Sequence, residues 1–182
     1  IVFDCGFEDT MGMQELRSLT RQLLKAHYYN RELDDPFFFS FCNIEPDSNI
    51  WALLQKFHSN QTGQTFDGYS QLPYHFSPRN FTDIFPREDL VMLSPDAKQS
   101  MYEVRSDKVY IIGAITDKAS SKPLTMSKAK RLGIPCMKLP LHLLKWKGPR
   151  KDLGLDVVLQ ILQMVNEGSA WEDALNHCLP QR

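Results

Sequence analysis

Residues 108–141, KVYIIGAITDKASSKPLTMSKAKRLGIPCMKLPL, decide the fold class of this chain. The apolar run at 109–115 predicts a buried strand that ends just before Asp117. A basic helix is predicted over 124–131, and the apolar run at 135–139 predicts a second strand. The order strand–helix–strand favours an α/β sheet of parallel strands, and such sheets bind ligands at the carboxyl ends of their strands.

The position of Asp117, after a strand and at the edge where ligands bind, makes it a candidate catalytic group. Gly113 lies shortly before it and, because it lacks a side chain, would let a ligand approach the backbone. The second interpretation is that Asp117 caps a turn, since Asp often accepts hydrogen bonds from nearby backbone N–H groups. The local pattern leaves both interpretations open.

The rest of the chain alternates between the same two kinds of pattern. Further strands are expected at 1–5, 37–42 and 88–93, and further helices at 10–29, 50–58, 153–165 and 169–178. This alternation predicts a largely parallel α/β sheet flanked by helices, in a single domain that spans 1–182. The polar segment 59–83 predicts a flexible insertion. Because Ile1 falls within a predicted strand, we expect an N-terminal part of the natural protein to be absent from this chain.

Charge is distributed unevenly along the chain. The net charge is −1, yet residues 101–151 hold twelve Lys and Arg against three acidic residues. This concentration surrounds the candidate crevice, so we favour a basic face that binds nucleic acid. The alternative is a solvated face that opposes acidic helices elsewhere in the fold.

Several classes of protein are disfavoured by what the sequence lacks. No apolar run is long enough for a membrane span. The four cysteines form no C-x-x-C pair, which favours reduced thiols inside the cell over a disulfide framework. The five histidines show no metal-ligand spacing, so no metal site is expected. Neither Gly-rich phosphate-binding fingerprint, G-x-G-x-x-G or G-x-x-x-x-G-K-[ST], is present.

The ends of the predicted strands resemble a known family. The motifs are Leu93-Ser94-Pro95, Ile112-Gly113-Ala114 with Asp117, Leu139-Pro140-Leu141, the opening segment 1–5 and the closing segment 171–175. Together they resemble the Trm10 family of transfer-RNA purine-9 N1-methyltransferases over essentially the whole chain. Segments 3–6, 107–110 and 129–132, with Trp146, are most similar to its mitochondrial branch, the methyltransferase subunit of mitochondrial ribonuclease P. Ala114 departs from the family in replacing a frequent second glycine.

The resemblance implies a SPOUT-type fold, in which a C-terminal trefoil knot forms the crevice for S-adenosyl-L-methionine. Backbone groups of the knotted loops would bind this cofactor. The residues implied for cofactor binding are Leu93, Ser94, Gly113, Ala114, Lys118, Ala119, Ser120, Leu139, Asp152, Leu153 and Gly154. For Leu139 and Leu153, plain core positions are an open alternative.

The implied reaction transfers a methyl group to N1 of purine 9, with Asp117 and Gln22 as the catalytic residues. Guanine N1 carries a proton, so Asp117 would act as its general base, and on adenine it would orient the base through the exocyclic amine. Gln22 matches a family position near the target base, where its amide can donate or accept. The alternative for Gln22 is a solvated glutamine on a helix face.

Basic residues around the crevice would hold transfer-RNA phosphates, which gives affinity and position without reading sequence. They are Arg21, Lys25, Lys122, Lys128, Lys130, Arg131, Lys145, Lys147, Arg150 and Lys151.

Three hypotheses for function remain open. The leading one is a methyltransferase of G9, A9 or both in the mitochondrial matrix that also belongs to mitochondrial ribonuclease P. There the resemblance implies a dehydrogenase-fold partner and a separate nuclease subunit. The second is a cytosolic or nuclear enzyme that methylates guanosine 9 alone. The third is an RNA-binding scaffold in which methyl transfer is dispensable. The domain itself is expected to be monomeric.

Overall fold

The computed structural model describes residues 1–63, 75–116, 123–144 and 153–179. Within them, seven strands form one sheet in the order β3-β2-β1-β6-β4-β7-β5, and every neighbouring pair is parallel. The strands are β1 Val2–Asp4, β2 Ser40–Cys42, β3 His75–Phe76, β4 Leu90–Leu93, β5 Gln99–Ser100, β6 Val109–Gly113 and β7 Cys136–Lys138. The helices are α1 Met13–Arg31, α2 Asn49–Thr62, α3 Leu124–Leu132, α4 Leu155–Asn166 and α5 Trp171–Cys178. The predicted parallel α/β sheet is confirmed.

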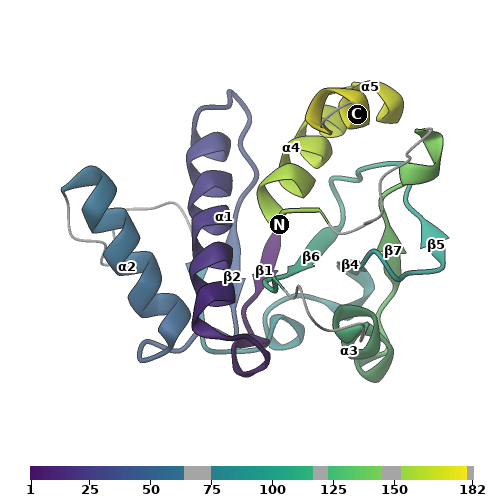
Figure 1. The fold of residues 1–182 in the computed structure, drawn as a ribbon. Helices are drawn as coiled ribbons and strands as arrows, with labels where there is room; N and C mark the ends of the chain where they lie inside the picture. Colours follow the sequence, from purple (N-terminus) through teal and green to yellow (C-terminus); the bar gives the residue numbers. More distant parts are fainter. Residues whose placement is uncertain (64–74, 117–122, 145–152, 180–182) are drawn as a thin grey trace.

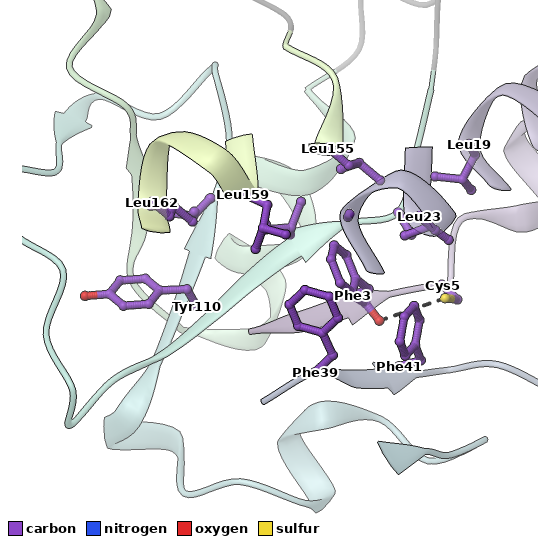
Figure 2. Packing of buried hydrophobic residues seen from close by; sticks show 14 of the residues in the cluster. Phe3, Cys5, Leu19, Leu23, Phe39, Phe41, Tyr110, Leu155, Leu159 and Leu162 are labelled. Atoms are coloured by element: carbon purple, nitrogen blue, oxygen red, sulfur yellow. Dashed lines mark hydrogen bonds between the residues drawn. The ribbon is translucent and has the colours of Figure 1, made fainter. Parts of the chain in front are cut away.

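The two faces of the sheet carry separate apolar clusters, because successive side chains of a strand point to opposite faces. On one face, Phe3 packs with residues of α1, α2, α4 and α5, and Figure 2 shows it beside Leu23 of α1. On the other face, Val2 and Ile111 pack with Ala129 of α3. Figure 1 shows α3 apart from the other four helices. Four helices therefore cover one face, and α3 lies on the other.

Helices α1 and α4 pack against each other, and each buries one side. In α1 the buried positions include Leu16, Leu19 and Leu23, whose spacing of three and four residues forms one helical face. Among the described residues, no helix is both long and apolar enough to cross a membrane. Helix α3 is capped at its C-terminal end by Gly133, whose φ of 67° is readily adopted only by glycine.

The sequence patterns miss two short strands. β5 lies at one edge of the sheet, and β3 lies at the other edge within the segment 59–83. In that segment α2 continues to Thr62, Phe76 is buried in the larger apolar cluster, and Phe81 is buried in the smaller one. The prediction of a flexible insertion is therefore wrong for its two ends, whereas 64–74 lie outside the described residues.

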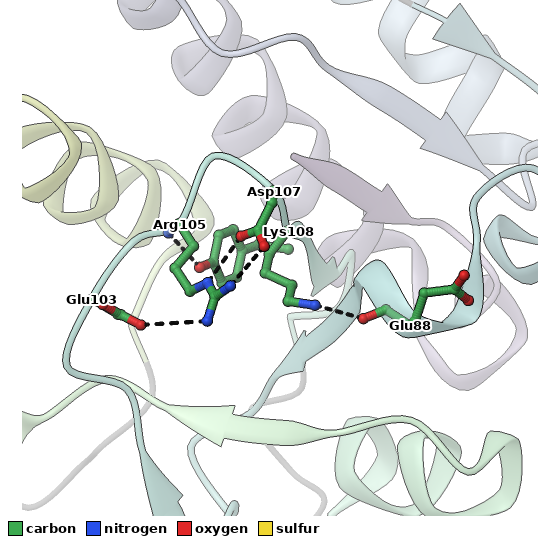
Figure 3. A network of polar contacts seen from close by, with 6 residues as sticks. Glu88, Glu103, Arg105, Asp107 and Lys108 are labelled. Carbon is green, nitrogen blue, oxygen red and sulfur yellow. Dashed lines mark hydrogen bonds and ion pairs between the residues drawn. The ribbon is translucent and has the colours of Figure 1, made fainter.

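The turn that leads into β6 is held by polar contacts (Figure 3). The Arg105 guanidinium donates to both carboxylate oxygens of Asp107, at 2.9 and 2.7 Å, and the Arg105 N–H donates to the Tyr110 hydroxyl at 2.8 Å. The hydrogen bond from Arg105 lowers the pKa of Asp107 below its usual value. Lys108 Nζ donates to the Glu88 carbonyl at 2.7 Å. Arg105 and Lys108, two of the cations in the basic stretch 101–151, are thus engaged in contacts with neighbouring residues.

Candidate functional site

Three candidate cofactor loops leave neighbouring strands at one edge of the sheet. Leu93 of β4 aligns with Ile112 of β6 on one side and with Met137 of β7 on the other. Because the strands are parallel, their carboxyl ends lie together at the edge where such sheets bind ligands. The structure therefore brings together five of the predicted cofactor residues: Leu93, Ser94, Gly113, Ala114 and Leu139.

Two backbone donors at this edge are already used within the protein. The Ser94 N–H donates to the Met137 carbonyl at 2.9 Å, and the Ala114 N–H donates to the Asp4 carbonyl at 2.8 Å. The expectation that backbone groups bind the cofactor is therefore wrong for these two N–H groups. Leu139 and Leu153 both pack against the larger apolar cluster, which supports a core role for each.

Gly113 lies where the sheet packs against Thr125 of α3. A Cβ at this position would lie 2.4 Å from Cγ2 of Thr125 and 3.2 Å from Cε2 of Phe7. Thr125 also donates from Oγ1 to Oγ of Ser94 at 2.8 Å, and both hydroxyl groups are buried. Glycine is needed here for the packing of α3, and the sequence patterns did not single out Thr125.

Gln22 is a partner of α4 and not a solvated glutamine. Its Oε1 accepts the N–H of Leu155, the first residue of α4, at 2.8 Å. One turn further along α1, Lys25 Nζ lies 3.7 Å from a carboxylate oxygen of Asp156. A Cβ on Gly154 would lie 3.3 Å from Gln22 Oε1. Gln22 is thereby placed beside Gly154, a predicted cofactor residue.

The chain just before Asp117 is tied to the start of α1. Thr116 Oγ1 donates to the Glu15 carbonyl at 2.8 Å, and the Thr116 N–H donates to Met11 Sδ at 3.4 Å. Asp117 itself lies outside the described residues, and so do the other predicted site residues Lys118, Ala119, Ser120, Lys122, Lys145, Lys147, Arg150, Lys151 and Asp152.

Lys128 is buried, and its assignment to RNA binding is wrong. Its Nζ lies 2.6 Å from Oδ2 of Asp4, and it lies over the rings of Phe7 and Phe81 at 4.8 and 5.6 Å from their centres. Asp4 has no exposed surface, and its Oδ1 accepts from Asn43 Nδ2 at 2.7 Å. A buried carboxylate needs such partners, so Lys128 serves the fold.

The other described basic candidates are exposed. Lys130 and Arg131 lie in the last turn of α3, where positive charge is favourable beside the helix carbonyls. The Arg21 guanidinium lies 5.4 Å from the centre of the Phe57 ring, and Lys25 is 73% exposed despite its contact with α4. These four cations remain available to a polyanion.

Thiol chemistry is not favoured at this edge. Burial, and then the neighbouring Asp4 carboxylate, raises the pKa of the Cys5 thiol well above its usual value, so this thiol stays protonated at neutral pH. All four cysteines are free. Within the described ranges, no group of three His, Cys, Asp or Glu side chains is arranged to hold a metal ion.

Comparison with known proteins identifies the family to which this chain belongs. The family model described as tRNA (guanine(9)-N(1))-methyltransferase TRM10/TRM10A matches residues 1–182. The chain belongs to this family. The predicted membership is confirmed, and the SPOUT-type sheet agrees with the crystal structure of full-length spTrm10 in complex with SAH. That structure superposes with a TM-score of 0.83 at 30% identity, over 98% of this chain and 93% of the other.

Two curated relatives are similar to the chain over its whole length. The mitochondrial ribonuclease P protein 1 homolog of Drosophila melanogaster is 32% identical over all of this chain and 40% of its own length. The human tRNA methyltransferase 10 homolog C is also 32% identical, over all of this chain and 43% of its own length. The chain therefore spans less than half of these relatives.

The contact of Gln22 with α4 predicts a measurable loss of stability. Gln22→Ala removes the acceptor for the Leu155 N–H, so the free energy of unfolding should fall by about 1 kcal/mol, as when other N-terminal caps are removed. Gln22→Glu keeps an acceptor at the positive end of α4 and should retain most of that stability. Urea unfolding measures both, with the exposed Gln14→Ala as control.

Gln22→Glu also isolates any contact with the target base, because it removes the amide donor while keeping the cap. If Gln22→Ala left the stability unchanged, the cap would contribute nothing. A methylation rate that is normal in Gln22→Glu would remove the amide donor from the reaction.

Proposed function

We propose that this chain is the catalytic domain of a tRNA purine-9 N1-methyltransferase that uses S-adenosyl-L-methionine. The observation that carries the proposal is the alignment of the carboxyl ends of β4, β6 and β7 at one sheet edge, in a chain that matches the family throughout. The SAH bound to spTrm10 supports the cofactor, because SAH is what remains after S-adenosyl-L-methionine gives up its methyl group. The trefoil knot stays a prediction.

The residues at this edge suit such a cofactor. Ser94, Gly113 and Ala114 are small, and Leu93 and Leu139 are apolar, although both leucines also pack within or against the larger apolar cluster. Ligand sites are commonly apolar with a few polar groups, a composition that fits an adenine ring and a thioether. When bound, S-adenosyl-L-methionine would supply a methyl group on a positively charged sulfur.

Asp117 is our proposed general base for guanine. The N1 nitrogen of guanine must lose its proton as it bonds to the methyl carbon, and a nearby carboxylate accepts such a proton. Adenine N1 already has a free lone pair, so on adenine the carboxylate would only orient the base. The residues on either side of 117–122 are held in place. Thr116 is bonded to α1 on one side, and on the other side α3 is bonded to the sheet through Thr125.

We further propose the mitochondrial branch for this chain. The name of the Drosophila relative, mitochondrial ribonuclease P protein 1 homolog, supports a mitochondrial location and membership in a ribonuclease P complex. The matrix location, the dehydrogenase-fold partner and the nuclease subunit are what the family resemblance implies. The description of the family model, tRNA (guanine(9)-N(1))-methyltransferase, supports guanosine 9 as the target. The alternative is therefore a cytosolic or nuclear enzyme that acts alone on guanosine 9.

Methylation of matched transfer RNAs that carry G9 or A9 tests the proposal. The full-length protein should methylate N1 of position 9. The assay uses labelled S-adenosyl-L-methionine and is run with and without the dehydrogenase-fold partner. Methylation of G9 without any partner would favour the alternative of a cytosolic or nuclear enzyme that acts alone. If neither purine were methylated while transfer-RNA processing continued, the RNA-binding scaffold would be the better account.

The exposed end of α3 predicts salt-dependent binding of RNA. Lys130→Glu with Arg131→Glu should lower transfer-RNA affinity about tenfold, and the slope of log K against log salt should fall by about 0.7–0.9 for each phosphate that is no longer neutralised. Because phosphate contacts carry no sequence information, different transfer RNAs should be affected alike. Filter binding at several salt concentrations gives both quantities.

Lys56→Glu serves as a control for that measurement, since Lys56 is exposed on α2, away from α3 in Figure 1. An unchanged salt slope in the α3 variant would exclude this end of the helix from the RNA-binding face.

A further inference from the structure

Three neighbouring strand ends meet α3 on the same face of the sheet. Asp4 of β1 aligns with Gly113 of β6, and Ser94 follows β4, the next strand along. Their preceding residues, including Phe3 and Ile112, belong to the cluster on the opposite face, so these three positions face α3. The contact between α3 and the sheet is thus made at the candidate cofactor edge.

Thr125 touches two of the three candidate cofactor loops at once. Its hydroxyl donates to Ser94 Oγ in the loop after β4, and its methyl group lies against Gly113, where β6 ends. A threonine side chain has few rotamers, and here the hydrogen bond fixes which way the methyl group points. The side chain therefore sets the spacing between the two loops.

Both sides of the Thr125 contact are fixed. On α3, one turn later, the buried ion pair of Lys128 with Asp4 fixes the helix to β1. On the sheet, the Ser94 N–H is bonded to β7 and the Ala114 N–H to β1. A change at Thr125 or Gly113 therefore moves the loops, because neither the helix nor the strands can shift easily.

We propose that Thr125 is a positioning residue for the cofactor site, which it shapes by holding Ser94 and Gly113 at a fixed separation. This inference rests on the proposed function. Thr125 need not touch the cofactor or the transfer RNA. Its effect would be on the affinity for S-adenosyl-L-methionine and not on the affinity for RNA.

A clash and its relief test the proposal in the full-length protein. In Gly113→Ala the new methyl group would collide with Thr125 Cγ2, so the affinity for S-adenosylhomocysteine, measured by calorimetry, should fall about tenfold or more. Thr125→Ser keeps the hydroxyl but lacks that methyl group, so alone it should lower the affinity less than Gly113→Ala does. The double variant should recover most of the loss, the contact with Phe7 at 3.2 Å limiting full recovery.

Thr125→Val tests the hydroxyl separately, because it keeps the shape and removes the bond to Ser94. It should raise KM for S-adenosyl-L-methionine about three- to tenfold with KM for transfer RNA unchanged. Thermal melting establishes that each variant is folded. Folded Gly113→Ala and Thr125→Val proteins with normal affinity for S-adenosylhomocysteine would overturn the inference, as would a folded double variant with no recovery. If the wild-type protein bound no S-adenosylhomocysteine, the proposed function itself would fail.

Discussion

Asp117→Asn should slow methylation of G9 by about 10²-fold or more, because the amide has nearly the same shape but cannot accept the guanine N1 proton. Methylation of A9 should fall less, since adenine N1 has no proton to lose. The affinity for S-adenosylhomocysteine should change little. Single-turnover rates on matched G9 and A9 transfer RNAs, with the full-length protein and its partner, measure the difference.

The exposed Asp34→Asn is a suitable control, because it makes the same chemical change in the turn between α1 and β2. Equal losses on both purines would show that Asp117 positions the base or cofactor and is not the proton acceptor. Unchanged rates on both would remove Asp117 from the active site and favour its role in capping a turn.

Lys128→Met should lower the free energy of unfolding by about 3–5 kcal/mol, because it leaves the Asp4 carboxylate charged and buried without its partner. Asn43 would still donate to that carboxylate, but a neutral donor does not replace the ammonium. Urea unfolding monitored by tryptophan fluorescence measures the change. Lys130→Met, on the exposed side of the same helix, should change the stability by less than about 0.5 kcal/mol.

Adding Asp4→Asn to Lys128→Met separates the effect of the ion pair from the effect of packing. The double variant buries no unpaired charge, so it should be more stable than Lys128→Met alone. A double variant that is as unstable as Lys128→Met would mean that the apolar stem of Lys128, between Phe7 and Phe81, is what stabilises α3.

The main strands could be predicted from sequence because parallel strands that are covered on both faces form continuous apolar runs. β4 and β6 are such runs, and both lie where the patterns predict them. β5 consists of Gln99 and Ser100 and exists only through its pairing with β7, so no local pattern indicates it. β3 was hidden for a similar reason, because its two residues lie in a polar segment.

The site was harder to predict than the fold, because charge and polarity do not reveal a distant partner. Lys128 and Lys130 are the same residue type two positions apart, yet only Lys128 meets a carboxylate. The available signal was Asp4, a charge inside an apolar strand, which requires a buried partner. Gln22 gave no such signal, since the N–H that it accepts belongs to a helix more than a hundred positions later in the chain.

The place of β1 in the interior of the sheet also determines when the sheet can be completed. β1 pairs with β2 on one side and with β6 on the other, where Val2 aligns with Ile111. As the chain is synthesised, β1, β2 and β3 can pair early, but β1 keeps an open, hydrogen-bonding edge until β6 has been made. Pairing β1 with β6 closes a long loop of chain, which carries a large entropy cost. Parallel sheets with such distant strand pairs fold slowly. The nascent protein is therefore open to wrong pairing and aggregation for longer than a domain built from neighbouring hairpins.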